Sequence, residues 1–336
     1  MEGFIRGLNR LVKLMSSKSN VHVNVQQPQT QKQQVRLNAG LGNIKLSGIK
    51  VKLAVMSGKG GVGKSLVTAS LATGFALRGL KVGVLDADIY GPTIPKLFGL
   101  VGSTLYYDDK RDLIIPANGP LNIKIVSIDF LLPSEDTAVI WRGSLVTRAI
   151  EDFLSKVDWG NLDVMIIDLP PGTGDAPLTV AQALSSQLTG SIVVSAPGDV
   201  SGRIVKKAID FSRKVKVPVI GVIENMCCFT CPDTGKTYYI FGEPEGKRIA
   251  EAANVPFLGE IPLDPRISEA NNQGIPFLLK YPDIEASKRV LAVVDELIDR
   301  LKDKLTEQAA KREIRLMKLP GEEEEESDEE DRTSSS

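Results

Sequence analysis

The chain has 336 residues and a formal net charge of −1, with 42% apolar and 25% charged residues. This is the composition of a globular protein, and the lack of surplus Lys and Arg argues against a nucleic-acid binder. No apolar run approaches the ~20 residues that span a bilayer, and the N-terminus lacks a secretory signal pattern. We therefore expect a cytoplasmic protein that binds no nucleic acid.

Both ends of the chain differ from its middle. Residues 1–15 carry an apolar stripe at helical spacing, which predicts a short amphipathic helix. We favour weak docking of this helix over contact with a membrane or partner, or a role as a mitochondrial presequence. Residues 16–38 are rich in Gln and predict a linker, and residues 316–336, with nine carboxylates among residues 322–331, predict a disordered acidic tail.

From Val51 onward, short β-branched runs alternate with longer helical patterns. This alternation predicts an α/β fold with a doubly wound, mostly parallel sheet and helices on both faces. The expected strands are Lys52–Ser57, Lys81–Asp86, Ile123–Asp129, Asp163–Asp168, Ser191–Ala196, Val217–Glu224 and Pro256–Glu260. The expected helices include Lys64–Arg78, Ser144–Lys156, Ala176–Gln187 and Gly202–Lys214. In such sheets, ligands bind beyond the carboxyl ends of the strands.

A phosphate-binding loop follows the first expected strand directly. Its residues are Gly58, Lys59, Gly60, Gly61, Val62, Gly63, Lys64 and Ser65, which satisfy the P-loop pattern between a strand and a helix. Glycines let backbone N–H groups curl around phosphate oxygens, and the helix start adds positive potential. We expect Lys64 to contact the β- and γ-phosphates of ATP and the Ser65 hydroxyl to bind Mg²⁺.

Three carboxylates close neighbouring strands at the same edge. Asp168 ends an apolar run where a Walker B acid is expected, and Asp86 and Asp88 end the second strand. Such residues also serve as helix caps or turn formers, but three of them after a P-loop favour magnesium and water positioning. We expect Asp86 and Asp168 to serve the metal, Asp88 to orient the attacking water and Lys59 to stabilise charge.

The three cysteines of the chain, Cys227, Cys228 and Cys231, fall within five residues. This spacing is poor for a disulfide framework and good for a soft metal. Pro232 and Gly235 predict a loop, in which little would bury the thiols. Buried inert thiols and a zinc ion shared by two chains remain the alternatives.

The glycine loop with Lys59 inside it resembles the deviant Walker A signature of the partitioning, cell-division-site and arsenite ATPases and of the Mrp-type (Mrp/ApbC-like) iron–sulfur cluster carriers. More specific segments resemble the Mrp-type branch: Asp86–Pro92, Trp141–Gly143, Asp168–Asp175 and Glu224–Met226. The similarity covers residues 50 to 300, and we expect a P-loop ATPase domain over 50–305.

The resemblance implies a homodimer that binds ATP near the subunit interface, with Lys59 of one copy reaching the phosphates of the other. It also implies that Asn225 contacts the adenine. In the family, a Cys-x-x-Cys pair from each subunit holds a [4Fe-4S] cluster across the dimer, for delivery to apo iron–sulfur proteins.

This chain departs from the family at its cysteines. The usual second cysteine would fall at position 234, which is Thr234, whereas Cys228 and Cys231 form a Cys-x-x-Cys pair three residues earlier. Two thiolates from each of two chains would still supply four soft ligands.

Two functions therefore compete at this stage. The first is a homodimeric ATPase that carries iron–sulfur clusters to apoproteins. The second is a nucleotide-switched positioning or regulatory ATPase of the partition type, without a cluster. The acidic C-terminus disfavours the second, because anionic lipid would repel it.

Overall fold

The computed structural model describes residues 46, 48–88, 91–131, 143–198 and 202–317. The predicted N-terminal helix, the Gln-rich linker and the acidic residues of the tail lie outside these residues, as do Trp141 and the stretch 89–90. The last helix, α11 (Glu285–Met317), continues past position 305, where the sequence placed the end of the domain.

A nine-stranded sheet forms the centre of the molecule, in the order β10-β9-β8-β1-β7-β2-β6-β5, with β11 pairing on the other edge of β9. Strands β5 and β10 are antiparallel to their neighbours and all the other pairs are parallel. The strands are β1 (Ile49–Ser57), β2 (Val82–Asp86), β5 (Ala117–Asn118), β6 (Lys124–Ser127), β7 (Leu162–Asp168), β8 (Gly190–Ser195), β9 (Val219–Thr230), β10 (Thr237–Tyr238) and β11 (Phe257–Leu263).

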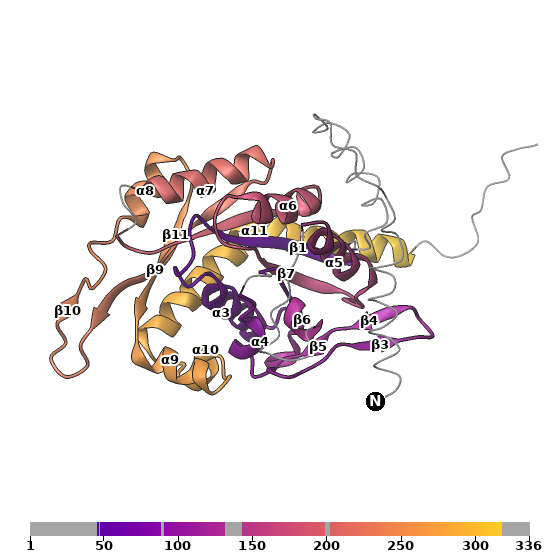
Figure 1. Ribbon diagram of the computed structural model, residues 1–336, viewed down its shortest axis with the longest axis horizontal. Coiled ribbons are helices and arrows are strands. Elements are labelled where there is room, and N and C mark those ends of the chain that lie inside the picture. Colours follow the sequence, from indigo (N-terminus) through magenta and orange to yellow (C-terminus); the bar gives the residue numbers. More distant parts are fainter. Residues whose placement is uncertain (1–45, 47, 89–90, 132–142, 199–201, 318–336) are drawn as a thin grey trace, which may run out of the picture.

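Helices cover both faces of this sheet (Figure 1). One face carries α3 (Lys64–Leu77) and α11, with α4 (Ile94–Leu97), α9 (Pro265–Asn272) and α10 (Phe277–Lys280) around them. The opposite face carries α6 (Asp175–Leu184), α7 (Arg203–Lys214) and α8 (Gly246–Ala252), with α5 (Gly143–Lys156) packed against α6. The predicted doubly wound α/β fold is thereby confirmed.

The central strands β1, β7 and β8 are buried almost throughout. Their continuous apolar runs suit this position, because helices exclude water from both faces of the strands. The parallel register sets Asp168 level with Val55 of β1 and with Asp86 of β2. The carboxyl ends of these three strands therefore form one edge, at which the P-loop begins.

Smaller elements complete the fold. Strands β3 (Tyr106–Asp108) and β4 (Leu113–Ile115) form a separate hairpin, and two short 3₁₀ helices, η2 (Pro120–Asn122) and η3 (Ile128–Leu131), flank β6. No helix within the described residues is both long and apolar enough to cross a membrane.

The largest difference from the expected elements lies in β9. The sequence placed its end at Glu224, but the strand continues to Thr230 because β10 and β11 pair with its last residues. The extension forms a hairpin with β10 that projects from the body of the protein (Figure 1). Two of the three cysteines therefore belong to a strand.

Candidate functional site

The phosphate-binding loop connects β1, which ends at Ser57, to α3, which begins at Lys64. Gly61 and Gly63 have φ angles of 79° and 78°, a region that glycine adopts at low cost. A Cβ on Gly58 would lie 2.3 Å from Cγ2 of Ile204, at the start of α7. Conformation and close packing therefore account for glycine at these positions.

Asn225 of β9 packs against this loop. Its Nδ2 donates a hydrogen bond of 3.0 Å to the carbonyl oxygen of Val62, and the residue is only 2% exposed. A Cβ on Gly63 would lie 2.2 Å from that Nδ2 atom. In this structure Asn225 thus holds the P-loop backbone, and its expected contact with adenine stays a prediction.

The ammonium of Lys64 lies among the predicted carboxylates. Its Nζ is 2.8 Å from Oδ2 of Asp168 and 3.4 Å from Oδ2 of Asp88. Asp168 also accepts hydrogen bonds from the Ser65 hydroxyl, at 2.5 Å, and from the Thr68 hydroxyl, at 2.8 Å. The structure therefore brings together Lys64, Ser65, Asp88 and Asp168, as the sequence predicted.

Thr68 is the residue of this group that the sequence analysis missed. It lies one helical turn after Lys64, and its hydroxyl contacts both the Lys64 carbonyl and Asp168. The available signal was this spacing, because residues i and i+4 share one face of a helix.

Asp86 is fully buried, and both of its oxygens accept hydrogen bonds from the protein. Oδ1 accepts from the backbone N–H of Asp88, and Oδ2 accepts from the N–H of Ile94 and from the Ser127 hydroxyl. Burial, with the Asp168 carboxylate nearby, raises the pKa of Asp86 well above its usual value. These bonds hold the turn after β2, and a role for Asp86 as a metal ligand stays a prediction.

The oxygen donors at this edge fit a magnesium ion. Mg²⁺ prefers hard oxygen ligands and usually takes one or two of them from the protein, with water and phosphate oxygens completing its shell. Ser65 and Asp168 provide such a pair. Within the described residues, no group of three or more His, Cys, Asp or Glu side chains is arranged to hold a metal ion.

The three cysteines have different surroundings. Cys227 lies in β9, is 2% exposed, and has its Sγ 3.2 Å from that of Cys228. Burial and the contact with Cys228 raise the pKa of Cys227. The expectation of a loop that leaves all the thiols accessible was therefore wrong for Cys227, because this residue lies in the part of β9 that pairs with β11.

Cys231 follows the end of β9, in a turn closed by hydrogen bonds from its own N–H to the Lys236 carbonyl, at 3.0 Å, and from the Gly235 N–H to its carbonyl, at 2.8 Å. It is partly exposed, as is Cys228. The Thr234 hydroxyl, with backbone N–H groups of the same turn, lowers the pKa of Cys231. Thr234, at the position of the second family cysteine, thus favours a thiolate at Cys231.

One strand therefore connects the nucleotide loop to the cysteines. Asn225 contacts the P-loop, and Cys228 follows three residues later in β9. Between them Met226 has a φ of 59°, which is uncommon for a residue with a side chain and marks an irregularity in the strand.

A sequence profile of the family described as the NUBPL iron-transfer P-loop NTPases, within the ParA group, matches residues 48–298. The chain belongs to this family. An iron–sulfur cluster carrier protein of Saccharolobus solfataricus is 51% identical, over 76% of this chain and 85% of the relative. The iron–sulfur cluster transfer protein NUBPL of Dictyostelium discoideum is 38% identical, over 80% of this chain and 84% of the relative.

Solved structures agree with this assignment. A nucleotide-binding protein of Archaeoglobus fulgidus, solved in complex with ADP and with cobalt present, has a TM-score of 0.63 and 40% identity, over 73% of this chain and 98% of that one. A septum-site-determining protein MinD of Pyrococcus horikoshii, solved with Mg-ADP, has a TM-score of 0.56 but only 20% identity, over 76% of this chain and 98% of that one. The second likeness shows the shared fold alone. Nucleotide binding and iron–sulfur cluster handling are thus properties of the family to which the chain belongs.

Proposed function

We propose that this protein is a homodimeric ATPase that binds a [4Fe-4S] cluster between two copies and delivers it to apo iron–sulfur proteins. The observation that carries this proposal is the course of β9, which contacts the P-loop through Asn225 and carries Cys228 three residues further on. A single strand thereby joins a nucleotide site to the thiols that would hold the cluster.

The nucleotide edge supplies the groups that ATP hydrolysis needs. Backbone N–H groups of the P-loop would hold the phosphates, and Lys64 would neutralise charge on the γ-phosphate. Asp88, 3.4 Å from Lys64, would orient a water for attack on the γ-phosphorus, as the bond to ADP breaks and phosphate leaves. Lys59 of the second copy would add positive charge from across the interface.

Mg²⁺, held by Ser65 and Asp168, would neutralise charge on the β- and γ-phosphate oxygens when bound. Thr68 and Lys64 orient the Asp168 carboxylate from the side of α3. Asp86 would act indirectly, because its hydrogen bonds fix the backbone that places Asp88.

The cluster would be held by Cys228 and Cys231 of both copies. A [4Fe-4S] cluster needs four thiolates, and one chain offers only two that are accessible. Cys227 is a poor ligand candidate because burial raises its pKa and keeps it protonated. Hydrogen bonds from Thr234 and the nearby backbone lower the pKa of Cys231, which favours the thiolate form that binds iron.

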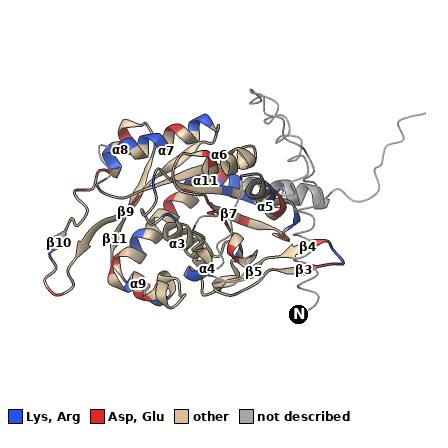
Figure 2. Ribbon diagram, viewed as in Figure 1, with Lys and Arg blue, Asp and Glu red and all other residues tan. Residues whose placement is uncertain are grey.

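An exposed apolar strip next to these thiols would be covered by the second copy. The apolar strip consists of Tyr238, Tyr239, Ile240 and Phe241, each between 44% and 58% exposed. Contiguous exposed apolar side chains mark interaction sites, and the β9–β10 hairpin beside the strip carries little charge (Figure 2). Because a shared cluster requires a second hairpin at the same place, a second copy of this chain fits the strip.

Cluster transfer tests the proposal directly. Protein reconstituted without oxygen is mixed with a purified apo-[4Fe-4S] enzyme whose recovered activity reports delivery. We expect transfer to depend on ATP and to slow at least about tenfold in Lys64→Ala, because charge neutralisation at the γ-phosphate is lost. The matched control is Lys214→Ala at the exposed end of α7, which should transfer at the normal rate. Transfer that needs neither ATP nor Lys64 would refute the coupling.

A further inference from the structure

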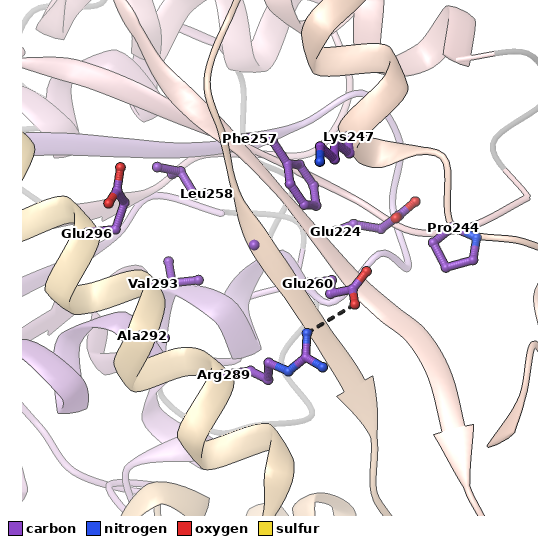
Figure 3. Close-up of a pocket in the computed structure, with 11 residues that line it drawn as sticks. Glu224, Pro244, Lys247, Phe257, Leu258, Glu260, Arg289, Ala292, Val293 and Glu296 are labelled. Atoms are coloured by element: carbon purple, nitrogen blue, oxygen red, sulfur yellow. Dashed lines mark hydrogen bonds and ion pairs between the residues drawn. The ribbon is translucent and has the colours of Figure 1, made fainter. Parts of the chain in front are cut away.

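A cavity of about 840 Å³ lies at the free edge of β11. Its wall is formed by β11 itself, by α11 on one side and by Pro244 and Lys247, before and within α8, on the other (Figure 3). The volume is within the range of sites for small organic ligands. Among the described strands, β11 pairs only with β9, so its outer edge adjoins the cavity.

Glu224 lines this cavity from β9 and is only 1% exposed. Its Oε1 accepts a hydrogen bond of 3.2 Å from the backbone N–H of Glu245. Its Oε2 is buried, and no group within the described residues donates a hydrogen bond to it. A buried carboxylate oxygen without a donor costs free energy, because the water that it loses is not replaced.

The other charged groups around the cavity do not neutralise Glu224. Arg289 pairs with Glu260 at 3.1 Å and with Glu285 at 2.7 Å, and Glu296 on the rim pairs with Arg300 at 2.6 Å. Lys247 forms no ion pair with Glu224 in the described structure. Burial raises the pKa of Glu224, the backbone N–H groups of Gly246 and Glu245 partly oppose this, and the Glu260 and Glu245 carboxylates raise the pKa further.

The wall next to Glu224 includes the aromatic ring of Phe257, with the Lys247 side chain beside it (Figure 3). A Cβ added to Gly246 would lie 3.0 Å from Cε2 of Phe257 and 3.1 Å from Cδ of Glu224, so the ring and the carboxylate are close neighbours. Figure 3 shows the Phe257 ring and the Glu224 side chain on the same side of the cavity, with Val293 and Ala292 of α11 on the other. A carboxylate beside an aromatic ring suits a cation with an apolar body.

We propose that this cavity binds an alkyl-guanidinium or alkyl-ammonium group, whose charged end donates to Glu224 and lies against the Phe257 ring, and whose carbon chain packs on Val293. The group could belong to a free organic cation or to an Arg or Lys side chain of a partner segment that adds to the edge of β11. Both sources present the same kind of charged group, and a small cation and an arginine peptide used as probes distinguish between them. The site is independent of the proposed cluster transfer.

Isothermal titration of the full chain with n-butylguanidinium tests this site, with the neutral isostere N-butylurea as the matched probe. The wild type should bind the cation at least about tenfold more tightly, because charge-assisted hydrogen bonds are about twice as strong as neutral ones. Glu224→Gln should abolish that preference. Glu296→Gln, on the rim, should leave it unchanged.

A second variant tests the same site independently, in case Glu224→Gln does not fold. Phe257→Leu keeps the apolar volume but removes the ring, and should weaken binding of the cation by roughly threefold, in keeping with a cation–π contribution. Unfolding temperatures and ATP affinities of both variants report whether the fold is intact.

Equal binding of both probes to the wild type, no binding of either, or full binding of the cation to folded Glu224→Gln would each overturn the proposal. A capped arginine peptide separates the sources. Binding of the peptide about tenfold tighter than butylguanidinium assigns the site to a partner segment, and binding of the small cation alone assigns it to a free ligand.

Discussion

At the residue scale, the sharpest feature is the contrast between Cys227 and Cys231. Burial raises the pKa of the first, and the Thr234 hydroxyl with nearby N–H groups lowers that of the second. Thiol reactivity follows the thiolate fraction, so the two residues should differ greatly in alkylation. Thr234, which stands where the family resemblance places a second cysteine, therefore lowers the pKa of Cys231, one of the two proposed cluster ligands.

Thr234→Val should raise the pKa of Cys231 by removing one hydrogen bond to its thiolate. The Cys231 alkylation rate in iodoacetamide, followed by mass spectrometry from mildly acid to alkaline pH, should shift its midpoint upward. Cys227 in the same sample is the internal control and should stay unmodified until the protein unfolds. An unchanged Cys231 midpoint would show that Thr234 does not stabilise the thiolate.

Asp86 permits a second prediction at this scale. Because burial raises its pKa, loss of its charge should affect Mg-ATP little, although Asn can replace only one of the two accepting oxygens. Asp86→Asn should keep Mg-ATP affinity within about threefold, whereas Asp86→Ala should lose about 1–3 kcal/mol of stability by leaving donors unpaired. Calorimetric titration and urea unfolding measure the two quantities. A large loss of Mg²⁺ dependence in Asp86→Asn would instead support the metal-ligand role.

At the scale of elements, the P-loop depends on β9 for its support. Gly63→Ala would need a side chain at φ 78° and would meet Asn225 Nδ2 at 2.2 Å. We expect it to lower the free energy of unfolding by about 2 kcal/mol, from the left-handed conformation alone, with the clash in addition. Gly60→Ala is the control, because its Cβ would meet no atom within 4 Å. Urea unfolding without nucleotide should separate the two, and equal stabilities would contradict this packing.

The β9–β10 hairpin and the apolar strip that follows it are expected to form the dimer contact. Phe241→Asp should shift the protein toward monomer, because a charge would be buried against the second copy. Sedimentation velocity over a range of concentrations measures this change, with Leu121→Asp as a control at another site of 45% exposure. A dimer of unchanged stability in Phe241→Asp would place the interface elsewhere.

Much of this arrangement of strands and helices could be predicted from the sequence. The order of strand, glycine loop and helix predicted the P-loop, and continuous apolar runs predicted buried parallel strands. The C-terminal end of β9 could not be predicted from the sequence. The strand extends to Thr230 because it pairs with β10 and β11, and the local sequence pattern does not reveal this pairing. Burial of Cys227 follows from the same pairing, and Asn225's contact with Val62 joins residues 163 positions apart.

At the scale of the whole molecule, one sheet holds three distinct regions. The carboxyl edge holds the P-loop with Lys64 and Asp168, the projecting end of β9 holds the cysteines, and the free edge of β11 holds the cavity beside Glu224. The family profile matches residues 48–298, a range that includes all three regions. The fold places all of them on or next to β9.

The central claim is that two copies hold one cluster through Cys228 and Cys231. Anaerobic reconstitution with iron and sulfide, followed by iron analysis and the visible sulfide-to-iron absorption band, measures it on the wild type and on Cys227→Ala, Cys228→Ala and Cys231→Ala. The account predicts about four irons per dimer in the wild type and in Cys227→Ala, and none in the other two variants. A wild type that binds ATP but no iron, or a cluster that survives both Cys228→Ala and Cys231→Ala, would contradict it.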